Sequence, residues 1–310
     1  MMENLQGVIQ EVKKVIAGKD RVLWMVLTAM LARGHILLED IPGVGKTTMA
    51  LAFSKAIGLD YGRVQFTPDV MPSDVTGFSM PDKNSGRMIY QKGAVICNLF
   101  LADELNRATS RTQSALLEAM EEGQVTVDGQ AHKLSEPFIV IATQNPVGAS
   151  GTALLPDSQL DRFSVRLTIG YPSQKYERAM LLSAQNSESI SSVREVMSRQ
   201  EFVDARKKAA EVYISDEVAD YIISLISATR ADPLFLRGAS PRATLSLADM
   251  SRAMAFVNSR DYVIPADVQT VFADTLSHRM LLSQQSEANG IDAQEACSMI
   301  LRKVKAPKVN

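Results

Sequence analysis

The segment DIPGVGKTT, from Asp40 to Thr48, constrains the fold more than any other part of the chain. It follows the apolar run HILLE (35–39), which is typical of a buried parallel strand, and it precedes the helical stretch TTMALAFSKAIG (47–58). A Gly-rich loop between a strand and a helix presents backbone N–H groups to phosphates at the helix N-terminus. We therefore expect an α/β domain that binds a nucleotide.

The residue types within this loop fit the chemistry of a bound nucleoside triphosphate. Gly43 and Gly45 let the backbone approach closely, Lys46 can reach the terminal phosphates, and Thr47 can offer its hydroxyl to Mg²⁺. The first glycine of the usual pattern GxxxxGK[ST] is Asp40 here, a residue type that tolerates unusual backbone angles. The predicted ATP contacts in this Walker A loop are Asp40, Pro42, Gly43, Val44, Gly45, Lys46, Thr47 and Thr48. A chance GKT after a strand is the alternative, and the flanking strand and helix argue against it.

A second apolar run, NLFLA (98–102), ends in Asp103 and Glu104, the arrangement of a Walker B motif. We expect Asp103 to hold Mg²⁺ through its water shell and Glu104 to orient and polarise the attacking water. Alone, an Asp-Glu pair after a strand is weak evidence, because ordinary strand ends carry such pairs. Following a phosphate loop, it predicts a site for phosphoryl transfer, which needs positioning and charge neutralisation more than covalent chemistry.

Further strand-like runs follow at RVQF (63–66), PFIVIAT (137–143) and SVRLTI (164–169), with helical patterns such as RTQSALLEAMEE from Arg111 between most of them. This alternation predicts a mostly parallel sheet covered by helices on both faces. Two further helical patterns open the chain, over about 4–16 and 20–34, the second with an expected N-cap at Asp20.

Two insertions interrupt the alternation of strands and helices. GRMIYQKG (86–93) lies in a stretch rich in Gly, Pro, Asp and Asn and predicts part of a small hairpin. QVTVDGQAHKL (124–134) predicts a second hairpin more strongly, because Asp128-Gly129 is a preferred pair for a tight turn.

After about residue 171 the strand signals stop, and the rest of the chain reads as helices. The polar stretch 186–200 is the candidate boundary. We therefore divide the chain into an α/β nucleotide-binding domain, residues 1–185, and a small all-helical lid domain, residues 186–310.

Composition narrows the classes of protein to consider. The two cysteines, Cys97 and Cys297, are far apart and show no metal-ligand spacing, which is compatible with a reducing cytoplasm. The N-terminus lacks the apolar stretch of a signal peptide, and no run approaches the ~20 apolar residues of a membrane helix, so we expect no membrane insertion. The net charge of -2 gives no support to a nucleic-acid partner.

Four segments of the chain resemble MoxR-family AAA+ ATPases: TPDVMPSDVTG, FLADELNRATSRTQSALLEAMEEGQVTVDG, FIVIATQNPVGASGTALLPDSQLDRF and GASPRATLSL. The similarity runs in order over about residues 8–283, and several of these motifs are specific to the family. An Asp at the first position of the phosphate loop, as at Asp40, is also familiar in this family.

The resemblance assigns roles to further residues. Asn145 in IATQNP resembles the sensor-1 residue, which holds the attacking water or the terminal phosphate; a turn-forming Asn before Pro146 is the alternative. Arg162 in LPDSQLDRF resembles the arginine finger that reaches the neighbouring subunit's nucleotide, with Arg166 as the fallback and a surface ion pair as the plain alternative.

Two more assignments depend on the resemblance. Arg242 in GASPRA resembles sensor 2, at the start of a helix of the second domain, although an Arg after Ser-Pro is unremarkable by itself. Ile16 and Gly18 belong to a segment that resembles the lining of an adenine pocket; a helix end with a Gly cap is a compatible alternative.

The resemblance also implies a function. It implies an ATP- and Mg²⁺-dependent ATPase that works as a homo-oligomer, a hexameric ring, with ATP between the two domains of one subunit. Such proteins act as chaperones in assembly, maturation or metal insertion, with a von Willebrand factor A-domain adaptor and a client protein. The two hairpins resemble insertions that face the pore or one side of the ring in magnesium-chelatase subunits and replicative helicases.

Three alternatives remain open at this point: a nucleic-acid-stimulated motor, a magnesium-chelatase-like subunit, and a passive scaffold that binds nucleotide without turnover. Glu104 argues against the scaffold, because a degenerate site often loses this residue first. The client, the adaptor and the subunit number do not follow from the sequence.

Overall fold

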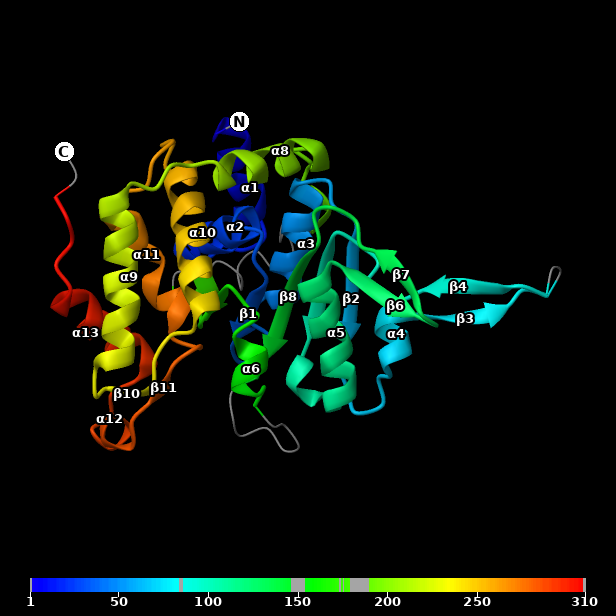
Figure 1. Ribbon diagram of the computed structural model, residues 1–310. Coiled ribbons are helices and arrows are strands. Elements are labelled where there is room, and N and C mark those ends of the chain that lie inside the picture. The colour runs from blue at the N-terminus through cyan, green and yellow to red at the C-terminus, as the bar shows by residue number, and fades with distance from the viewer. Residues whose placement is uncertain are drawn as a thin grey trace.

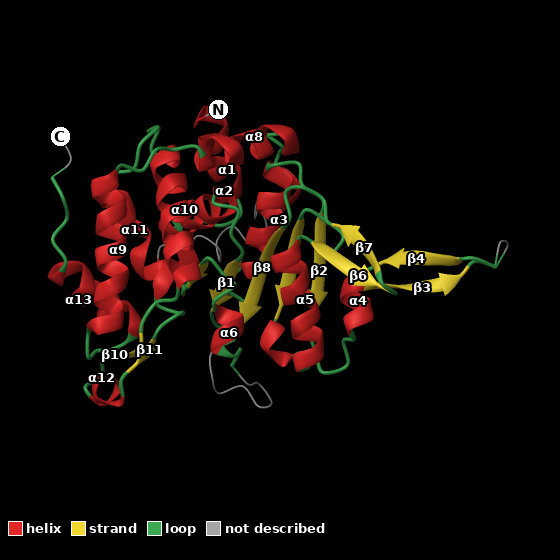
Figure 2. Cartoon of the chain, viewed as in Figure 1, coloured by secondary structure: helices red, strands yellow, loops and turns green. Residues whose placement is uncertain are grey.

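The computed structural model describes residues 2–83, 86–145, 154–172, 174, 176–178 and 190–308. At its centre is a five-stranded sheet in the order β2-β5-β8-β1-β9, in which every pair of neighbours is parallel (Figures 1 and 2). The strands are β1 (Ile36–Glu39), β2 (Tyr61–Gln65), β5 (Leu99–Asp103), β8 (Ile139–Gln144) and β9 (Val165–Leu167). The predicted parallel sheet is confirmed, and all five strands lie within two residues of where the apolar runs begin.

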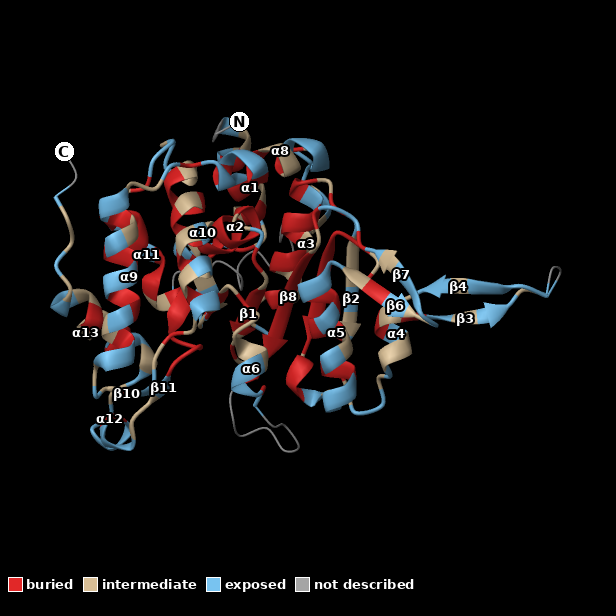
Figure 3. Ribbon diagram, viewed as in Figure 1, coloured by how far each residue is buried: buried red, intermediate tan, exposed pale blue. Residues whose placement is uncertain are grey.

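The three inner strands, β5, β8 and β1, are buried on both faces of the sheet, while the edge strand β2 is partly exposed. Successive side chains of a strand point to opposite sides, so each inner strand contributes to two cores. On β1, Ile36 and Leu38 belong to the core shared with α1 (Met2–Lys13), α2 (Asp20–Leu31) and α3 (Lys46–Ala56). Leu37 between them belongs to a second core. That second core is shared with α5 (Ser110–Glu122). Figure 3 shows the buried residues concentrated on the sheet and on the inner sides of these helices.

The sequence predicted an N-cap for α2 and none for α5, and the structure differs at both helices. Thr109 caps α5 as its hydroxyl accepts from the N–H of Thr112, and η1 (Leu105–Arg107) leads into this helix from β5. The expected N-cap at Asp20 is wrong: Asp20 is the first residue inside α2, and its carboxylate pairs with Lys13 at the end of α1. Competition from a nearby cation therefore removes the carboxylate from the capping position.

Both predicted hairpins are present. β3 (Gly77–Pro81) and β4 (Met88–Lys92) follow α4 (Pro72–Thr76) and project from the side of the molecule opposite the C-terminal helices (Figure 1). The sequence predicted only the second strand of this pair. β6 (Gln124–Val127) and β7 (Gln130–Lys133) flank Asp128 and Gly129, which both have positive φ, as a tight hairpin turn requires.

The C-terminal part is helical and packs beside the sheet, sharing the core of α1 to α3. Its helices are α8 (Arg199–Ala210), α9 (Asp216–Ala231), α10 (Pro241–Val257), α11 (Pro265–Leu276), α12 (Gln284–Ala288) and α13 (Ala293–Lys303). The short elements α6 (Asp157–Leu160) and η2 (Ile190–Ser192) precede them. All of these helices, with the others among the described residues, are too short or too polar to traverse a lipid bilayer.

One prediction about the C-terminal part is wrong, that it contains no strands, and another, the domain boundary, stays a prediction. β10 (Phe235–Arg237) pairs with β11 (Leu281–Leu282) in an antiparallel ribbon, so strands do occur after residue 171. Segments of two or three residues are too short to show the alternation that identifies a strand. The predicted domain boundary between residues 185 and 186 lies outside the described residues and stays a prediction.

Candidate active site

The predicted phosphate loop leaves the carboxyl end of β1 and enters α3 at Lys46. Gly43 and Gly45 have φ of 86° and 94°, a left-handed conformation that favours glycine. A side chain at Gly45 would also crowd Ile16, whose Cδ1 lies 3.0 Å from the position of a Cβ there. The loop therefore requires these two glycines for its shape.

A cavity of about 360 Å³ opens beside this loop. It lies at the carboxyl edge of the sheet, because the loop, Asp103 and Asn145 all stand where parallel strands end. Its lining residues are Pro42, Gly43, Gly45, Lys46, Thr47, Thr48, Gln65, Asp103, Glu104 and Asn145. The structure thus gathers most of the predicted ATP and Mg²⁺ contacts around one space; Val44 packs against the core instead.

Lys46 reaches across the loop. Its Nζ donates to the backbone carbonyl of Asp40 at 2.6 Å and to Oδ1 of Asn145 at 3.4 Å. Burial lowers the pKa of Lys46, while the charges of Asp40, Asp103 and Glu104 oppose that shift. The ammonium is therefore held close to three carboxylates in a partly desolvated position.

Asp40 uses its carboxylate to brace the loop. Oδ1 accepts from the N–H of Ile41 at 2.9 Å, and Oδ2 accepts from the N–H of Gly170 at 2.6 Å. These bonds tie the start of the loop to the segment that follows β9. The residue that departs from the usual glycine thus takes a structural role that glycine has no side chain to fill.

Thr143 on β8 links the two acidic residues of the predicted Walker B motif. Its hydroxyl donates to Oδ1 of Asp103 at 2.7 Å and accepts from the backbone N–H of Glu104 at 2.8 Å. The other oxygen of Asp103, Oδ2, accepts from Nη2 of Arg63 on the neighbouring strand β2 at 2.8 Å. Asp103 is thereby fixed in position from both sides.

Glu104 sits in a left-handed conformation with φ of 55°, which is uncommon outside glycine and clusters at functional sites. Its Oε2 accepts from Nη1 of Arg107 at 2.7 Å, and its Oε1 accepts from Nδ2 of Asn145 at 3.0 Å. The hydrogen bond from Arg107 is the largest of several causes that hold the pKa of Glu104 below its ordinary value. Asn145 joins this carboxylate to Lys46, so the predicted catalytic groups form one network.

The predicted arginines lie elsewhere. Arg162 donates from Nη1 to the carbonyl of Leu117 at 2.8 Å, and both Arg162 and Arg242 pair with Glu121 near the end of α5. The fallback, Arg166, pairs with Glu39 at 3.1 Å. The described residues that line the nucleotide cavity include none of these three arginines.

The C-terminal helices hold the backbone around Arg162. Arg279 donates from Nη2 to the carbonyl of Phe163 at 2.6 Å, and the Ser240 hydroxyl donates to Asp161 at 3.1 Å. His278 contacts the same carbonyl at 2.8 Å. A shift of the C-terminal helices would therefore move Arg162 together with Arg242.

The segment predicted to line an adenine pocket, with Ile16 and Gly18, lies against the phosphate loop. Ile16 is only 7 % exposed and contacts the loop beside Gly45. Gly18 has φ of 72°, and a Cβ there would fall 2.2 Å from the ring of Tyr176. Glycine is therefore required at position 18, where an aromatic ring covers the backbone.

Sequence reasoning missed several partners. Arg107 could have been found from the sequence, because residues three apart near a helix start face one another. Arg63 and Gln65 could also have been found, because they share one side of a strand that lies beside β5. Glu121 and Arg279 gave no signal, because their partners are distant in the sequence.

Comparisons with known proteins agree with this architecture. A family model described as "ATPase family associated with various cellular activities (AAA)" matches residues 35–165, and one described as "AAA lid domain" matches residues 227–299. An uncharacterised protein of Bacillus subtilis, YeaC, is 43% identical over 96% of this chain and 93% of its own. Chaperone MoxR1 of Mycobacterium tuberculosis is 35% identical over 100% of this chain and 84% of its own.

More distant sequences and a solved structure give the same picture. Protein MoxR of Methylorubrum extorquens is 29% identical over 88% of this chain and 86% of its own. A crystal structure of an ATPase candidate from Cytophaga hutchinsonii superposes with a TM-score of 0.91 at 38% identity, covering 99% of this chain and 96% of the other.

Proposed function

This chain belongs to the MoxR family of AAA+ ATPases, and from that premise we propose that it is an ATP-driven, chaperone-like remodeller that works as a ring of identical subunits. Its reaction is the hydrolysis of ATP to ADP and phosphate. The network that joins Lys46, Asn145 and Glu104 beside the phosphate loop is the observation that carries the proposal. Preorganised groups of this kind stabilise the charge that develops during phosphoryl transfer.

In this proposal the loop backbone and Lys46 bind the phosphates, and Ile16 and Gly18 contact the adenine. Glu104 accepts a hydrogen bond from the attacking water, and Asn145 fixes that carboxylate beside the terminal phosphate. The low pKa of Glu104 keeps it ionised at neutral pH, as this role requires.

Oxygen donors suited to Mg²⁺ line the same cavity. Thr47 and Asp103 supply a hydroxyl and a carboxylate, and the part of the chain that the structure describes contains no cluster of three His, Cys, Asp or Glu side chains that could hold a metal. Mg²⁺ prefers few protein ligands together with phosphates and waters, so the donor set fits. The ion would neutralise charge on the phosphates, while Arg63 and Thr143 orient Asp103.

Arg162 and Arg242 complete the site of the neighbouring subunit. Both pair with Glu121 and stand apart from the cavity of their own chain, which favours action on another chain's nucleotide. From the resemblance of the sequence we expected ATP to bind between the two domains of one subunit. The position of Arg242 instead favours an ATP site between subunits. Because Arg279 and Ser240 hold the segment around Arg162, motion of the C-terminal helices would follow the state of the neighbour's nucleotide.

The client side of the proposal depends on the relatives and the hairpins. One relative is named a chaperone, which supports a chaperone-like role. The finer proposal, a role in assembly, maturation or metal insertion of client complexes with a von Willebrand factor A-domain adaptor, depends on the resemblance of the sequence motifs. The β3–β4 hairpin exposes Phe78, Met80 and Ile89 on one face and Met88 on the other, apolar side chains suited to contact with a client or another subunit. The buried free thiols of Cys97 and Cys297 fit a place in the cytoplasm.

The test is the steady-state ATPase rate per subunit as a function of protein concentration, with Glu104→Gln as the blank. A specific rate that rises with concentration and then saturates is the expected result, because each site needs Arg162 from a neighbour. Mass measurement over the same range should show a ring, six subunits in the proposal, forming as the rate rises. A rate that is independent of concentration in a protein shown to be monomeric would contradict the ring.

A further inference from the structure

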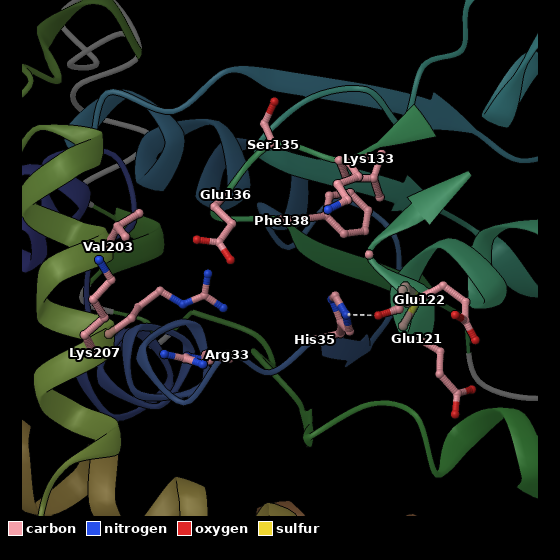
Figure 4. Close-up of a pocket in the computed structure, with 14 residues that line it drawn as sticks. Arg33, His35, Glu121, Glu122, Lys133, Ser135, Glu136, Phe138, Val203 and Lys207 are labelled. Atoms are coloured by element: carbon pink, nitrogen blue, oxygen red, sulfur yellow. Dashed lines mark hydrogen bonds between the residues drawn. The ribbon is translucent and has the colours of Figure 1, made fainter. Parts of the chain in front are cut away.

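A second cavity, of about 550 Å³, lies at the amino edge of the sheet. Arg33 and His35 precede β1, and Phe138 precedes β8, so this cavity is separated from the phosphate loop by the length of the strands. No described residue lines both cavities. Figure 4 shows Arg33, Lys207 and Glu136 on one side of the space, Glu121 and Glu122 on the other, and His35 between them.

Arg206 on α8 is the unusual member of this cavity. The side chain is only 9 % exposed, its Nε is buried without a hydrogen-bond partner, and it makes no ion pair with any residue of the described ranges. Burial, followed by the charge of Arg33, lowers the pKa of Arg206 to about 10, and Glu136 partly opposes the shift. A buried charge without a partner destabilises a fold, and an anion bound beside this guanidinium would relieve that cost.

Three more cations line the same space; Arg33 and Lys207 lie together on one side, and Lys133 lies apart from them (Figure 4). Arg33 adopts a left-handed conformation with φ of 59° and has neither a hydrogen bond nor an ion pair within the described part of the chain. Lys207 follows Arg206 on α8 and makes only a long contact of 3.7 Å with Asp204. Asp249 lies near Arg33 and Asp204 near Lys207, but neither carboxylate lines this cavity. Among the lining residues on this side, Glu136 is the one carboxylate, so this wall, as the surface that faces the cavity, keeps an excess of positive charge.

The other carboxylates do not neutralise that wall. Glu121 pairs with Arg162 and Arg242, and Glu122 lies with it on the opposite side of the cavity (Figure 4). The His35 ring is engaged as well, since Nδ1 accepts from the N–H of Val140 and Nε2 contacts the carbonyl of Met120.

We propose that this cavity is a second anion site, which binds the phosphate group of a small phosphorylated molecule through Arg206, Arg33 and Lys207. Guanidinium groups match phosphate oxygens with paired N–H donors, and arginine is the usual choice for a desolvated phosphate contact. The volume falls within the range of small-molecule sites, roughly 300–1,000 Å³. A phosphate dianion balances the excess charge of the wall and supplies acceptors for Nε of Arg206.

Such a ligand would join the two parts of the molecule. Arg33 belongs to the α2–β1 connection, whereas Arg206 and Lys207 belong to the C-terminal helices. His35, Met120 and Glu121 also line an adjoining cavity together with Arg162 and Arg242. Occupancy would therefore draw α8 toward the sheet beside the arginines proposed to act on the neighbouring subunit.

The test uses the full chain carrying Lys46→Ala, so that the phosphate loop does not take up the probe. Thermal unfolding is followed during titration with inorganic phosphate and with pyrophosphate, against sodium chloride of equal ionic strength and against citrate. We expect a saturable rise of Tm with pyrophosphate and phosphate, and none with citrate or chloride. Adding Arg206→Met should remove the rise, whereas the matched exposed neighbour Lys208→Met should keep it.

Four outcomes would overturn the proposal. The first is the absence of a saturable rise with either phosphate probe, and the second is a rise that survives both Arg206→Met and Arg33→Gln. The third is a saturable response to citrate alone, which would make the ligand a carboxylate. The fourth is a lower Tm for Arg206→Met than for its parent in buffer without multivalent anions, since removal of an unpaired buried charge should not destabilise. Failure of Arg206→Met to fold counts as this fourth outcome, and the exposed Arg33→Gln tests the rise independently by losing or keeping it.

Discussion

Charged side chains at the two edges of the central sheet differ in whether they have hydrogen-bond partners within the chain. At the carboxyl edge, Lys46, Asp103 and Glu104 each have a hydrogen-bond partner within the chain, and Asn145 joins two of them. At the amino edge, the buried guanidinium of Arg206 has none among the described residues. The same strands thus carry a site whose side chains are already fixed and a site whose central cation lacks a partner.

The difference teaches what each edge requires. Catalytic groups need fixed positions before the reaction, and for the proposed roles of Asp103 and Glu104 the pairs Arg63–Asp103 and Arg107–Glu104 supply such positions. A binding pocket gains affinity from groups that find their partner only in the ligand, because an unsatisfied buried cation raises the free energy of the unliganded protein. The free-energy cost of leaving Arg206 unpaired at the amino edge would therefore favour the binding of an anion there.

The largest expected effect concerns Arg162, which precedes β9 and lines neither the cavity at the phosphate loop nor the one around Arg206. Arg162→Ala should leave ATP affinity within about twofold and lower turnover by about 10³-fold or more, because an arginine finger acts on the transition state. ATP binding is measured with a fluorescent analogue and turnover by phosphate release. Arg166→Ala, which breaks only the pair with Glu39, is the matched control and should retain most of the activity.

Mixed rings of two variants test whether Arg162 acts on the site of its own chain or on that of a neighbouring chain. Rings assembled from Arg162→Ala and Glu104→Gln subunits should regain part of the activity, because some sites then combine an intact Glu104 with a neighbour's intact Arg162. If mixed rings form and remain inactive, the arginine acts within its own chain, and the carboxyl edge is complete without a neighbour.

An intermediate effect concerns His35 at the amino edge. Burial lowers the pKa of His35 to about 4, so the folded protein keeps this ring neutral where the unfolded chain, with a pKa near 6.5, binds a proton. Its contribution to stability is complete above pH 6.5 and is lost as the pH falls toward 4. The loss amounts to about 2 kcal/mol at pH 5. His35→Gln should therefore flatten the decline of the unfolding free energy between pH 7 and pH 5, measured by urea denaturation.

His132 provides the control for that measurement. It is partly exposed and stacks on Tyr90 with ring centroids 3.7 Å apart. His132→Gln should keep the steep decline of the unfolding free energy. If that free energy declines equally in His35→Gln and in the parent, the pKa of His35 does not differ between the folded and the unfolded protein in the way described. His278, whose pKa burial also lowers, remains in both variants and leaves part of the slope.

Local sequence patterns predicted the carboxyl edge well. An apolar strand, a Gly-rich loop and an Asp-Glu pair are each contained within a few residues, and a parallel sheet brings strand ends to one edge. Gly43, Gly45, Lys46 and Thr47, with Asp103 and Glu104, could therefore be grouped into one site by sequence reasoning alone.

Contacts between distant segments could not be predicted in this way. Arg242 and Glu121 are 121 residues apart, and nothing near either residue indicates the other. The same holds for Arg206, which reads as one of several cations on an amphipathic helix until packing buries it. The cap expected at Asp20 failed for a related reason, because Lys13 from the preceding helix takes its carboxylate.

The smallest expected effect tests whether the partners at the carboxyl edge tune the chemistry or only hold the side chains. Arg107 is the main cause of the lowered pKa of Glu104, so Arg107→Gln should let that pKa rise. Because the carboxylate is the active form, the acid limb of the kcat–pH profile should move to higher pH, with little change at pH 8, where Glu104 is ionised in both proteins. Arg107→Lys should restore part of the shift, and Arg111→Gln, an exposed neighbour on α5, should leave the profile unchanged. An unaltered acid limb in Arg107→Gln would mean that another group sets it and that the Arg107 pair serves only to position Glu104.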